Sequence, residues 1–336
     1  FSILALLVQP ANTMKYRAVI FAILFFRLFQ LNGQIAREMA GINADSLMNE
    51  FPEFSITEKI DTLNKIASSI VKDYPDSCWK LAEWTLRMSD SLDYQKGLAD
   101  GYQNLGNSYL AADSLSHAIL NYLFAERIYD QLEPSLEFAY VCRSLLVLNF
   151  YNGRSKQAIK YGLKEIDILR QTNNFSELCF PYQRIAWIYR RLDEPDSSLS
   201  YNKIAMSYAD SFQVSYCYNI FGLLNKDQFE RSTDTAFLNK SIDLFFDGLS
   251  SPGINDHMKS AMHLNLFFAY KNYGNKDMDN LALYHLNQVI PNAEKSKDAF
   301  YNIPWSHIMR GRVLEKQEKY DSAIFLYKQS FMKKMK

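Results

Sequence analysis

The sequence predicts an all-α protein, and its composition gives three reasons. The 336 residues include only 12 glycines and 9 prolines, below the average usage of roughly 7% and 5%, which argues against a turn-rich β architecture. Hydrophobic residues make up 48% and charged residues 22%, as in globular chains rather than disordered ones. Abundant Leu and Ala, with 23 Phe and 22 Tyr, favour helices that bury large side chains along one stripe.

The balance of charge excludes one class of partner. Lys and Arg number 37, and Asp and Glu also number 37. A chain without net positive charge has no general means of holding a nucleic-acid backbone. We therefore expect no direct nucleic-acid binding by this region.

The first element along the chain, residues 1–33, has the order of a secretory signal peptide. Met14 is the expected start, and an upstream extension precedes it. Two basic residues come after Met14, then a mostly apolar run over residues 18–31, then small or polar residues. This run is shorter than the roughly 20 residues that span a bilayer as a helix. We expect export to the periplasm and a mature chain that begins near Gln34; an uncleaved anchor and a buried helix are the alternatives.

A repeat of about 40 residues runs through the rest of the chain. A small residue that opens each expected second helix of a helical hairpin recurs at intervals of 40, 40, 40, 43, 41 and 41 residues. We call these seven positions the small-residue markers: Cys78, Ala118, Ala158, Ser198, Ser241, Ala282 and Ala323. Small residues let two antiparallel helices approach closely, so the repeat predicts helical hairpins over residues 56–331. Residues 34–55 form an N-terminal linker or cap, and residues 332–336 a truncated C-terminal end.

One copy carries the full pattern of the repeat. Its first helix has an aromatic residue, a Leu-Gly pair and a tyrosine, and its second helix has two alanines around an aromatic residue: Tyr102, Leu105, Gly106, Tyr109, Ala118, Tyr122 and Ala125. This pattern resembles the tetratricopeptide repeat (TPR), and the resemblance covers about residues 56–331. It implies a right-handed α-solenoid of about seven hairpins that folds as one array. The copies at 222–249 and 262–290 match poorly. Residues 250–255 are typical of a longer turn, and if the array has a hinge or an irregular junction, we expect it near 250–256.

The resemblance also implies where a partner binds. In TPR proteins the first helix of each hairpin lines a concave groove that holds a protein or peptide. The groove-facing positions of this sequence are Asn104, Asn107, Arg143, Gln183, Arg184, Trp187, Arg190 and Arg191. Asn can donate to and accept from a peptide backbone, and Arg can fork onto a carboxylate or phosphate. Three of them, Asn107, Arg143 and Arg184, faintly resemble a carboxylate clamp, although Gln103 replaces its first Lys. The alternative is that these are solvated side chains.

The sequence has no motif of catalysis or cofactor binding. Residues 101–108 almost spell a phosphate-binding loop, but Asn107 stands where the Lys is needed and no strand precedes it. His257 and His263 are six residues apart and do not share a helical face. We therefore predict a non-enzymatic protein with no cofactor, no catalytic residue and histidines that are on the surface or packed. An active site within residues 215–300 is the remaining alternative.

Cysteine spacing argues against a metal site. The four cysteines include no C-x-x-C pair and no nearby histidine that completes a zinc pattern: Cys78, Cys142, Cys179 and Cys217. Each lies in an apolar helical stretch, so small buried side chains are expected. Export would permit disulfides, and spacings of 37 and 38 residues could bring the cysteines of neighbouring repeats together.

Acidic residues gather in the expected turns between helices. Asp93 and Asp193 belong to two such clusters. Because Asp is a preferred N-cap residue, we expect these side chains to cap the next helix in each case.

The array and the export segment together imply a class of function. They resemble the periplasmic sensing regions of bacterial membrane regulators, in which the array leads into a transmembrane helix and a cytoplasmic LuxR-type helix-turn-helix or histidine-kinase output. The expected function is thus a sensory or protein-interaction module, with a membrane tether beyond Lys336. A free-standing periplasmic scaffold for envelope complexes is the alternative.

Overall fold

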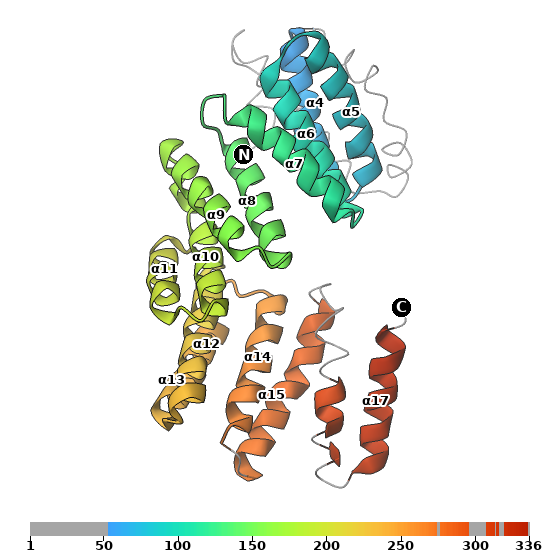
Figure 1. Cartoon of the computed structure of the whole chain (residues 1–336). Coiled ribbons are helices and arrows are strands. Elements are labelled where there is room, and N and C mark those ends of the chain that lie inside the picture. The colour runs from blue at the N-terminus through green and yellow to red at the C-terminus, as the bar shows by residue number, and fades with distance from the viewer. Residues whose placement is uncertain (1–52, 274–275, 296–306, 313, 316–318, 335–336) are drawn as a thin grey trace, which may run out of the picture. The chain divides into compact units, whose positions relative to one another are not determined.

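The described part of the chain is helical throughout. The computed structural model describes residues 53–273, 276–295, 307–312, 314–315 and 319–334, and it contains helices and turns but no strand within these ranges (Figure 1). The prediction of an all-α protein is confirmed. The predicted export segment, most of the linker before residue 56 and the last two residues lie outside the described residues.

The chain divides into two compact units, the first ending at Asn152 and the second beginning at Gly153. The helices of the first unit are α4 (Ile56–Ile70), α5 (Pro75–Ser91), α6 (Gln95–Ala111), α7 (Leu115–Tyr129) and α8 (Leu136–Tyr151). Consecutive helices pack as pairs, α4 with α5 and α6 with α7, and the first helices α4 and α6 also contact each other. α4 begins with a capping box, in which Ser55 and Glu58 each bond the other's backbone.

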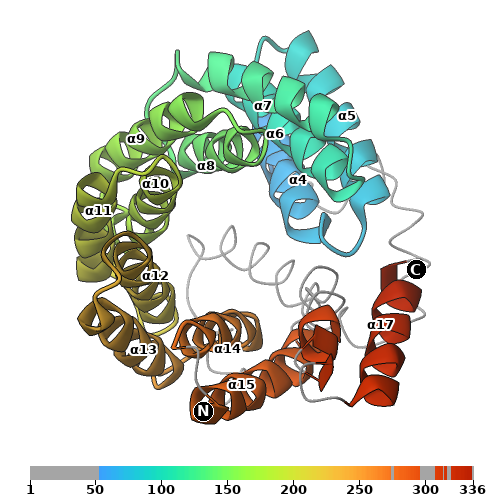
Figure 2. The ribbon, with the colours of Figure 1, turned by 60° about the horizontal axis from the view of Figure 1, so that its bottom comes forward.

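The second unit repeats this arrangement. Its elements are α9 (Ser155–Gln171), the 3₁₀-helix η3 (Phe175–Glu177), α10 (Cys179–Arg191), α11 (Pro195–Tyr208), α12 (Val214–Ser232), α13 (Thr235–Leu249), α14 (Asp256–Lys271), α15 (Lys276–Lys295) and α17 (Tyr320–Lys334), with residues 307–312 also helical. The hairpins are α10–α11, α12–α13 and α14–α15, and the first helices α10, α12 and α14 are neighbours in space (Figure 2). Whether the two units form one continuous array stays a prediction.

The small-residue markers are the points of closest helix packing. Each opens a second helix, and all seven are buried, six of them fully and Ala323 at 2% exposure. Two markers are serines. Ser198 Oγ donates to the carbonyl oxygen of Ala186 and Ser241 Oγ to that of Gly222, both at 2.8 Å. A serine can thus replace alanine at this position because the facing backbone satisfies its hydroxyl.

Glycines on first helices face large rings on second helices. A Cβ added to Gly106 would lie 2.8 Å from two ring carbons of Tyr122, and one added to Gly222 would lie 2.5 Å from the ring of Phe245. The pair at Gly222 belongs to the copy that the sequence matched poorly. The hairpin nevertheless forms there, because a glycine on the first helix again leaves room for an aromatic ring of the second helix.

Two turns with acidic clusters use a left-handed backbone rather than side-chain caps. Asp93 and Asp193 have φ of 49° and 62°, a conformation that Asp tolerates better than most residues. The helices next in the chain, α6 and α11, have no side-chain hydrogen bond at the N-cap. The prediction that these acids cap the next helix was therefore wrong; they allow the chain to reverse direction. The turn between α13 and α14 is the longer one expected from the sequence, with Gly253 at φ 76°.

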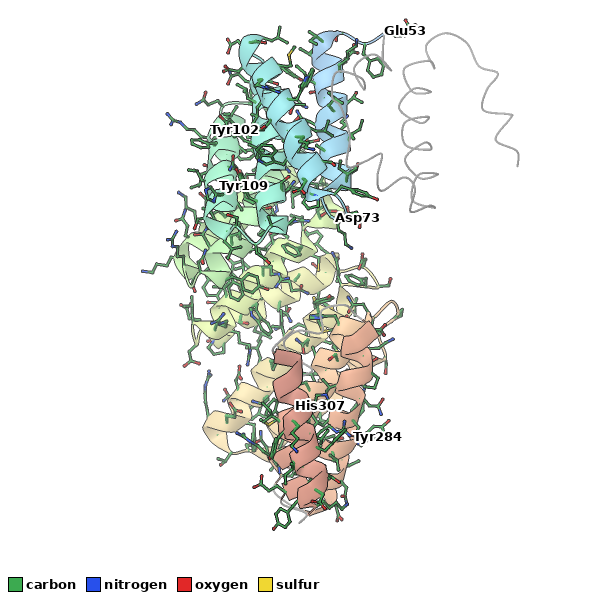
Figure 3. All side chains as sticks on the ribbon, turned by 90° about the vertical axis from the view of Figure 1, so that its right-hand side faces the viewer. Glu53, Asp73, Tyr102, Tyr109, Tyr284 and His307 are labelled. Atoms are coloured by element: carbon green, nitrogen blue, oxygen red, sulfur yellow. The ribbon has the colours of Figure 1, made fainter. Side chains whose placement is uncertain are left out.

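Tyrosines of the repeat pattern fill the space beside the second helices. The ring of Tyr102 lies 5.3 Å from that of Phe124, and Tyr109 stacks on His117 at 5.1 Å. Both tyrosines are labelled in Figure 3. These contacts account for the recurring aromatic positions, since rings of this size cover the seam between two helices.

We predict that Gly106→Trp destabilises the protein by about 1–3 kcal/mol or more, because an indole cannot share the space held by the Tyr122 ring. Urea unfolding followed by circular dichroism measures the loss. Ser116→Trp adds the same group at an exposed position on α7 and should change the midpoint little. Equal midpoints for the two variants would contradict the packing described for this hairpin.

Candidate functional site

The predicted groove residues lie on three first helices. Asn104 and Asn107 are on α6 and Arg143 is on α8, in the first unit. The other five are on α10, in the second unit. The clamp-like set of Asn107, Arg143 and Arg184 is divided between the units, so its assembly stays a prediction.

Asn104 is part of a buried polar network between helices. Its side chain is 3% exposed, and its Nδ2 donates to the backbone oxygen of Asn64 at 3.0 Å and to Asn64 Oδ1 at 3.2 Å. Thr85 Oγ1 donates to the same Oδ1 at 2.8 Å. These bonds join α4, α5 and α6. In this conformation the Asn104 amide serves helix packing.

The other two residues of the first unit are half-buried. Tyr122 donates its hydroxyl to Asn107 Oδ1 at 2.7 Å, so a second-helix tyrosine orients this amide. The Arg143 guanidinium lies 5.0 Å from the centre of the Tyr140 ring, a cation–π distance. Both side chains keep part of their surface in solvent.

Three predicted groove residues of α10 join it to α12. Gln183 is 8% exposed and donates to Cys217 Sγ at 3.6 Å. Arg190 forks onto Asp227, with Nε and one terminal nitrogen donating at 2.6 and 2.8 Å. Its guanidinium also lies 5.4 Å from the Trp187 ring, and Trp187 packs against the core between α12 and α13. These contacts hold neighbouring first helices side by side.

Arg184 is different from Arg190. Its guanidinium lies 5.0 Å from the centre of the Phe180 ring, and its buried Nε has no hydrogen-bond acceptor within the described part of the chain. A buried donor without an acceptor costs roughly 1–3 kcal/mol. Among the predicted groove residues, Arg184 is therefore the one with a buried donor left unsatisfied by the described part of the chain. The remaining residue, Arg191, is exposed at the end of the same helix.

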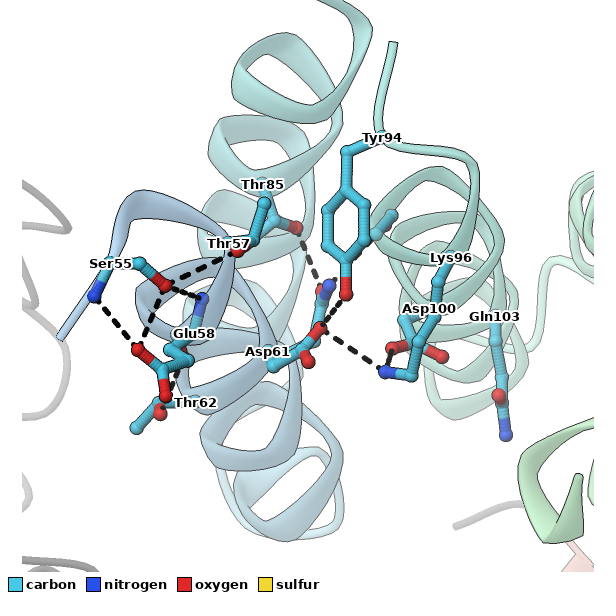
Figure 4. Close-up of polar contacts among 12 residues, drawn as sticks. Ser55, Thr57, Glu58, Asp61, Thr62, Thr85, Tyr94, Lys96, Asp100 and Gln103 are labelled. Atoms are coloured by element: carbon cyan, nitrogen blue, oxygen red, sulfur yellow. Dashed lines mark hydrogen bonds and ion pairs between the residues drawn. The ribbon is translucent and has the colours of Figure 1, made fainter. Parts of the chain in front are cut away.

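A charged cluster that the sequence did not predict joins α4 to α6 (Figure 4). Lys96 Nζ contacts Asp61 at 3.1 Å and Asp100 at 2.7 Å, and the Tyr94 hydroxyl donates to Asp61 at 2.8 Å. The hydroxyl of Tyr129 donates to Asp100. Burial raises the pKa of Asp100, and burial and Asp61 raise the pKa of Tyr94 to about 12. The i,i+4 spacing of Lys96 and Asp100 can be seen in the sequence. Their contact with Asp61 of α4 cannot, because it depends on how the two helices pack.

A second unpredicted contact is a histidine pair between α14 and α15. His263 Nδ1 and His285 Nδ1 are 2.9 Å apart. His285 is 3% exposed and stacks on the Tyr270 ring at 5.5 Å, with the edges of Phe246 and Tyr284 against it. Burial lowers the pKa of both histidines to about 4, and for His285 the neighbouring His263 adds to the effect. Both rings are therefore neutral at pH 7, and one donates its proton to the other.

This pair bears on the alternative of an active site within residues 215–300. That alternative needs His257 and His263 near a carboxylate. The hydrogen bond of His263 instead goes to a neutral imidazole. Across the described ranges no three His, Cys, Asp or Glu side chains gather as a metal site would require.

Comparison of the structure with known proteins identifies the fold. The sequence matches no protein-family model and no curated protein. The structure is similar to the apo form of the quorum sensor NprR from B. thuringiensis, with a TM-score of 0.61, 13% identity and coverage of 95% of this chain and 86% of the other. It is also similar to the apo form of RapI, with a TM-score of 0.55, 11% identity and coverage of 82% and 98%.

A third solved structure is described as a tetratricopeptide repeat sensor. This is the STAND protein PH0952 from Pyrococcus horikoshii, with a TM-score of 0.56, 13% identity and coverage of 98% of this chain and 48% of the other. The chain has the tetratricopeptide-repeat fold. The TPR frame predicted from the small-residue markers is confirmed, and α10, α12 and α14 are first helices of consecutive TPR hairpins.

No helix in the part of the chain that the structure describes is long and apolar enough to cross a bilayer.

The histidine pair predicts a pH dependence of stability in this TPR chain. Because the folded-state pKa values lie near 4 and the ordinary value is 6.5, the unfolded chain binds protons first as the pH falls. The contribution of the two neutral histidines to the free energy of unfolding is complete above about pH 6.5, and it is lost progressively as the pH falls towards 4. Urea midpoints measured between pH 7 and pH 5 should fall for the wild type and fall less for the double variant His263→Leu/His285→Phe.

The control for this prediction is His117→Gln, since His117 is exposed and lies on α7 of the first unit, whereas the pair belongs to the second unit. This variant should keep the wild-type slope. A double variant that also keeps that slope would show that the pair does not titrate as described.

The ion pair between α10 and α12 gives a second prediction. Asp227→Asn should lower the free energy of unfolding by about 1–3 kcal/mol, because the Arg190 fork is largely shielded, with side chains 19% and 21% exposed. Asp193→Asn is the control, since its pair with Arg231 is far more exposed, at 78% and 41%, and should cost about 0–1 kcal/mol. Urea unfolding measures both, and equal losses would contradict the role given to burial.

Proposed function

We propose that this chain is a non-enzymatic TPR module that binds a protein or peptide along its first helices, and that it is the sensing part of an exported or membrane-anchored bacterial signalling protein. Two similar structures support a sensing role, since one is described as a quorum sensor and another as a tetratricopeptide repeat sensor. In this proposal the first helices form the surface on which the partner lies, and Arg184 on α10 is the group that binds it.

The observation that carries the binding proposal is the unsatisfied Nε of Arg184. A carboxylate or phosphate of a partner could accept from a terminal nitrogen of this guanidinium and, once the side chain turns outward, from Nε, which is buried in this conformation. The guanidinium carbon lies 5.0 Å from the centre of the Phe180 ring, a cation–π distance that favours this position of the side chain. The bound anion would offset the cost of burying the donor.

The surroundings of Arg184 favour an anion. α10 carries three arginines and no Asp or Glu, so a partner's negative charge meets no acid on this helix. The charge of Arg190 is already matched by Asp227, and Arg191 adds positive charge at the exposed end of the helix. Trp187, one turn from Arg184, offers an apolar surface beside the charge.

The proposed location depends on residues 1–33, which carry the order of a signal peptide. Fusion of residues 14–40 to alkaline phosphatase lacking its own signal tests export directly. Phosphatase activity in intact bacteria supports a periplasmic module, and activity confined to lysates would overturn this part of the proposal.

Sensor and scaffold differ in the region of the gene downstream of the array. Reading the gene past the codon for Lys336 separates them. A transmembrane segment followed by a DNA-binding or kinase region supports the sensor. A stop codon favours the free-standing periplasmic scaffold.

We predict that Arg184→Glu/Arg191→Glu leaves folding intact and weakens binding of an anionic partner at least about tenfold, or 1.4 kcal/mol, because attraction becomes repulsion. Fluorescence anisotropy of labelled acidic peptides with a free carboxyl terminus, at low salt, measures the affinity. Raising the salt concentration should shrink the difference.

The control is Lys160→Glu/Lys203→Glu, which reverses two exposed charges on the second helices α9 and α11. It changes the net charge equally but not the first-helix face. Equal weakening by both double variants would point to a general charge effect and would count against Arg184 as the binding group.

A further inference from the structure

Two cysteines of the second unit lie together where α10 and α12 meet. Cys179 is the first residue of α10, and Cys217 is in the first turn of α12. Both are buried with no exposed surface. Gln183 Nε2 donates to Cys217 Sγ at 3.6 Å. Gln183 lies four residues after Cys179 on α10, so both side chains are on the face of α10 that meets Cys217. The two thiols are near enough to shift each other's pKa.

The other cysteines have different surroundings. Cys78 Sγ donates to the backbone oxygen of Asn104 at 3.5 Å, as a small buried side chain with an oxygen acceptor does. Cys142 is buried in α8 of the first unit. Both provide matched controls, since they are equally buried thiols of the same chain.

We propose that Cys179 and Cys217 are a disulfide site, at which a small disulfide oxidant converts the thiol pair into a bond that ties α10 to α12. The sequence left two pairings open, Cys142 with Cys179 at a spacing of 37 residues and Cys179 with Cys217 at a spacing of 38. The packing of α10 on α12 and the hydrogen bond from Gln183, on the same face of α10 as Cys179, to Cys217 Sγ select Cys179 with Cys217.

The side chains around the two sulfurs set the order of the chemistry. Gln183 Nε2 donates to Cys217 Sγ at 3.6 Å, which favours the thiolate of Cys217. The pKa of Cys217 is lowered by its interaction with Cys179 and by Gln183, and the pKa of Cys179 is raised by its interaction with Cys217 and by burial. Cys217 is thus the thiolate that attacks one sulfur of the oxidant, breaking its S–S bond and releasing one thiol after proton uptake. Cys179 then loses its proton and attacks Cys217 Sγ of the mixed disulfide, releasing the second thiol. The protein dithiol is oxidised by two electrons, and the oxidant is reduced to two thiols.

The bond would have a structural consequence. It would close a chain segment that contains all of α11 and would link two first helices that are not consecutive in sequence. A cross-link of this kind stabilises mainly by restricting the unfolded chain. Because both sulfurs are buried, the oxidant must enter through a local opening of the hairpins, so the reaction should be slow in the native state.

The experiment uses the full chain and oxidised glutathione. The reduced protein is incubated under native conditions, its remaining thiols are alkylated after denaturation, and non-reduced peptides are mapped by mass spectrometry. We expect a cross-linked peptide that joins Cys179 to Cys217. Its mass should be about 2 Da, the mass of two hydrogen atoms, below the summed masses of the two reduced, unalkylated peptides. The urea midpoint should rise on oxidation.

Variants separate this pair from the others. Cys78→Ala/Cys142→Ala should still form the cross-link and show the rise in midpoint. Cys179→Ser should show neither, and its Cys217 should stop at the glutathione adduct. Should Cys179→Ser fail to fold, the comparison of oxidised and reduced Cys78→Ala/Cys142→Ala decides. Full alkylation of Cys179 and Cys217 after oxidation, separate glutathione adducts on both, or pairing with another cysteine would overturn the proposal.

Discussion

The structure depends on the close approach of two antiparallel helices at one small residue in every repeat. A hairpin buries its apolar face only if its second helix comes near enough for rings such as Tyr122 and Phe245 to lie over glycines of the first helix. A larger residue at a marker position would separate the helices and expose both faces. Since each TPR hairpin also covers its neighbour, this one constraint repeats along each unit.

The polar side chains buried between hairpins complete the packing in a different way. Apolar contacts tolerate small shifts between helices at little cost in free energy. A buried amide, guanidinium or imidazole is stable only when its hydrogen-bond partner is in position. Asn104 with Asn64, Arg190 with Asp227 and His263 with His285 are such fixed points. The first two join helices of neighbouring hairpins and the third joins the two helices of one hairpin, so polar pairs set much of the register between helices.

The first-helix face supplies packing between hairpins, and the binding proposed above would use the same face. Asn104, Gln183 and Arg190 direct their hydrogen bonds to neighbouring helices, and in the second unit this holds the backbone that presents Arg184. The Arg184 guanidinium lies 5.0 Å from the centre of the Phe180 ring, and its Nε has no acceptor among the described residues. The binding proposal rests on this unsatisfied donor between neighbouring helices that are held in place.

The sequence by itself determined the helical class, the repeat and the position of every second helix, because close helix packing imposes small residues at a nearly constant spacing that can be read along the chain. It also named first-helix residues such as Arg184 and Arg190, but it could not separate a satisfied side chain from an unsatisfied one. That difference depends on partners 37 or 40 residues away, as in Arg190–Asp227 and Asn104–Asn64, or 22 residues away in His263–His285. Only the tertiary structure decides such pairs, because periodicity shows which face is buried but not which side chains meet across it.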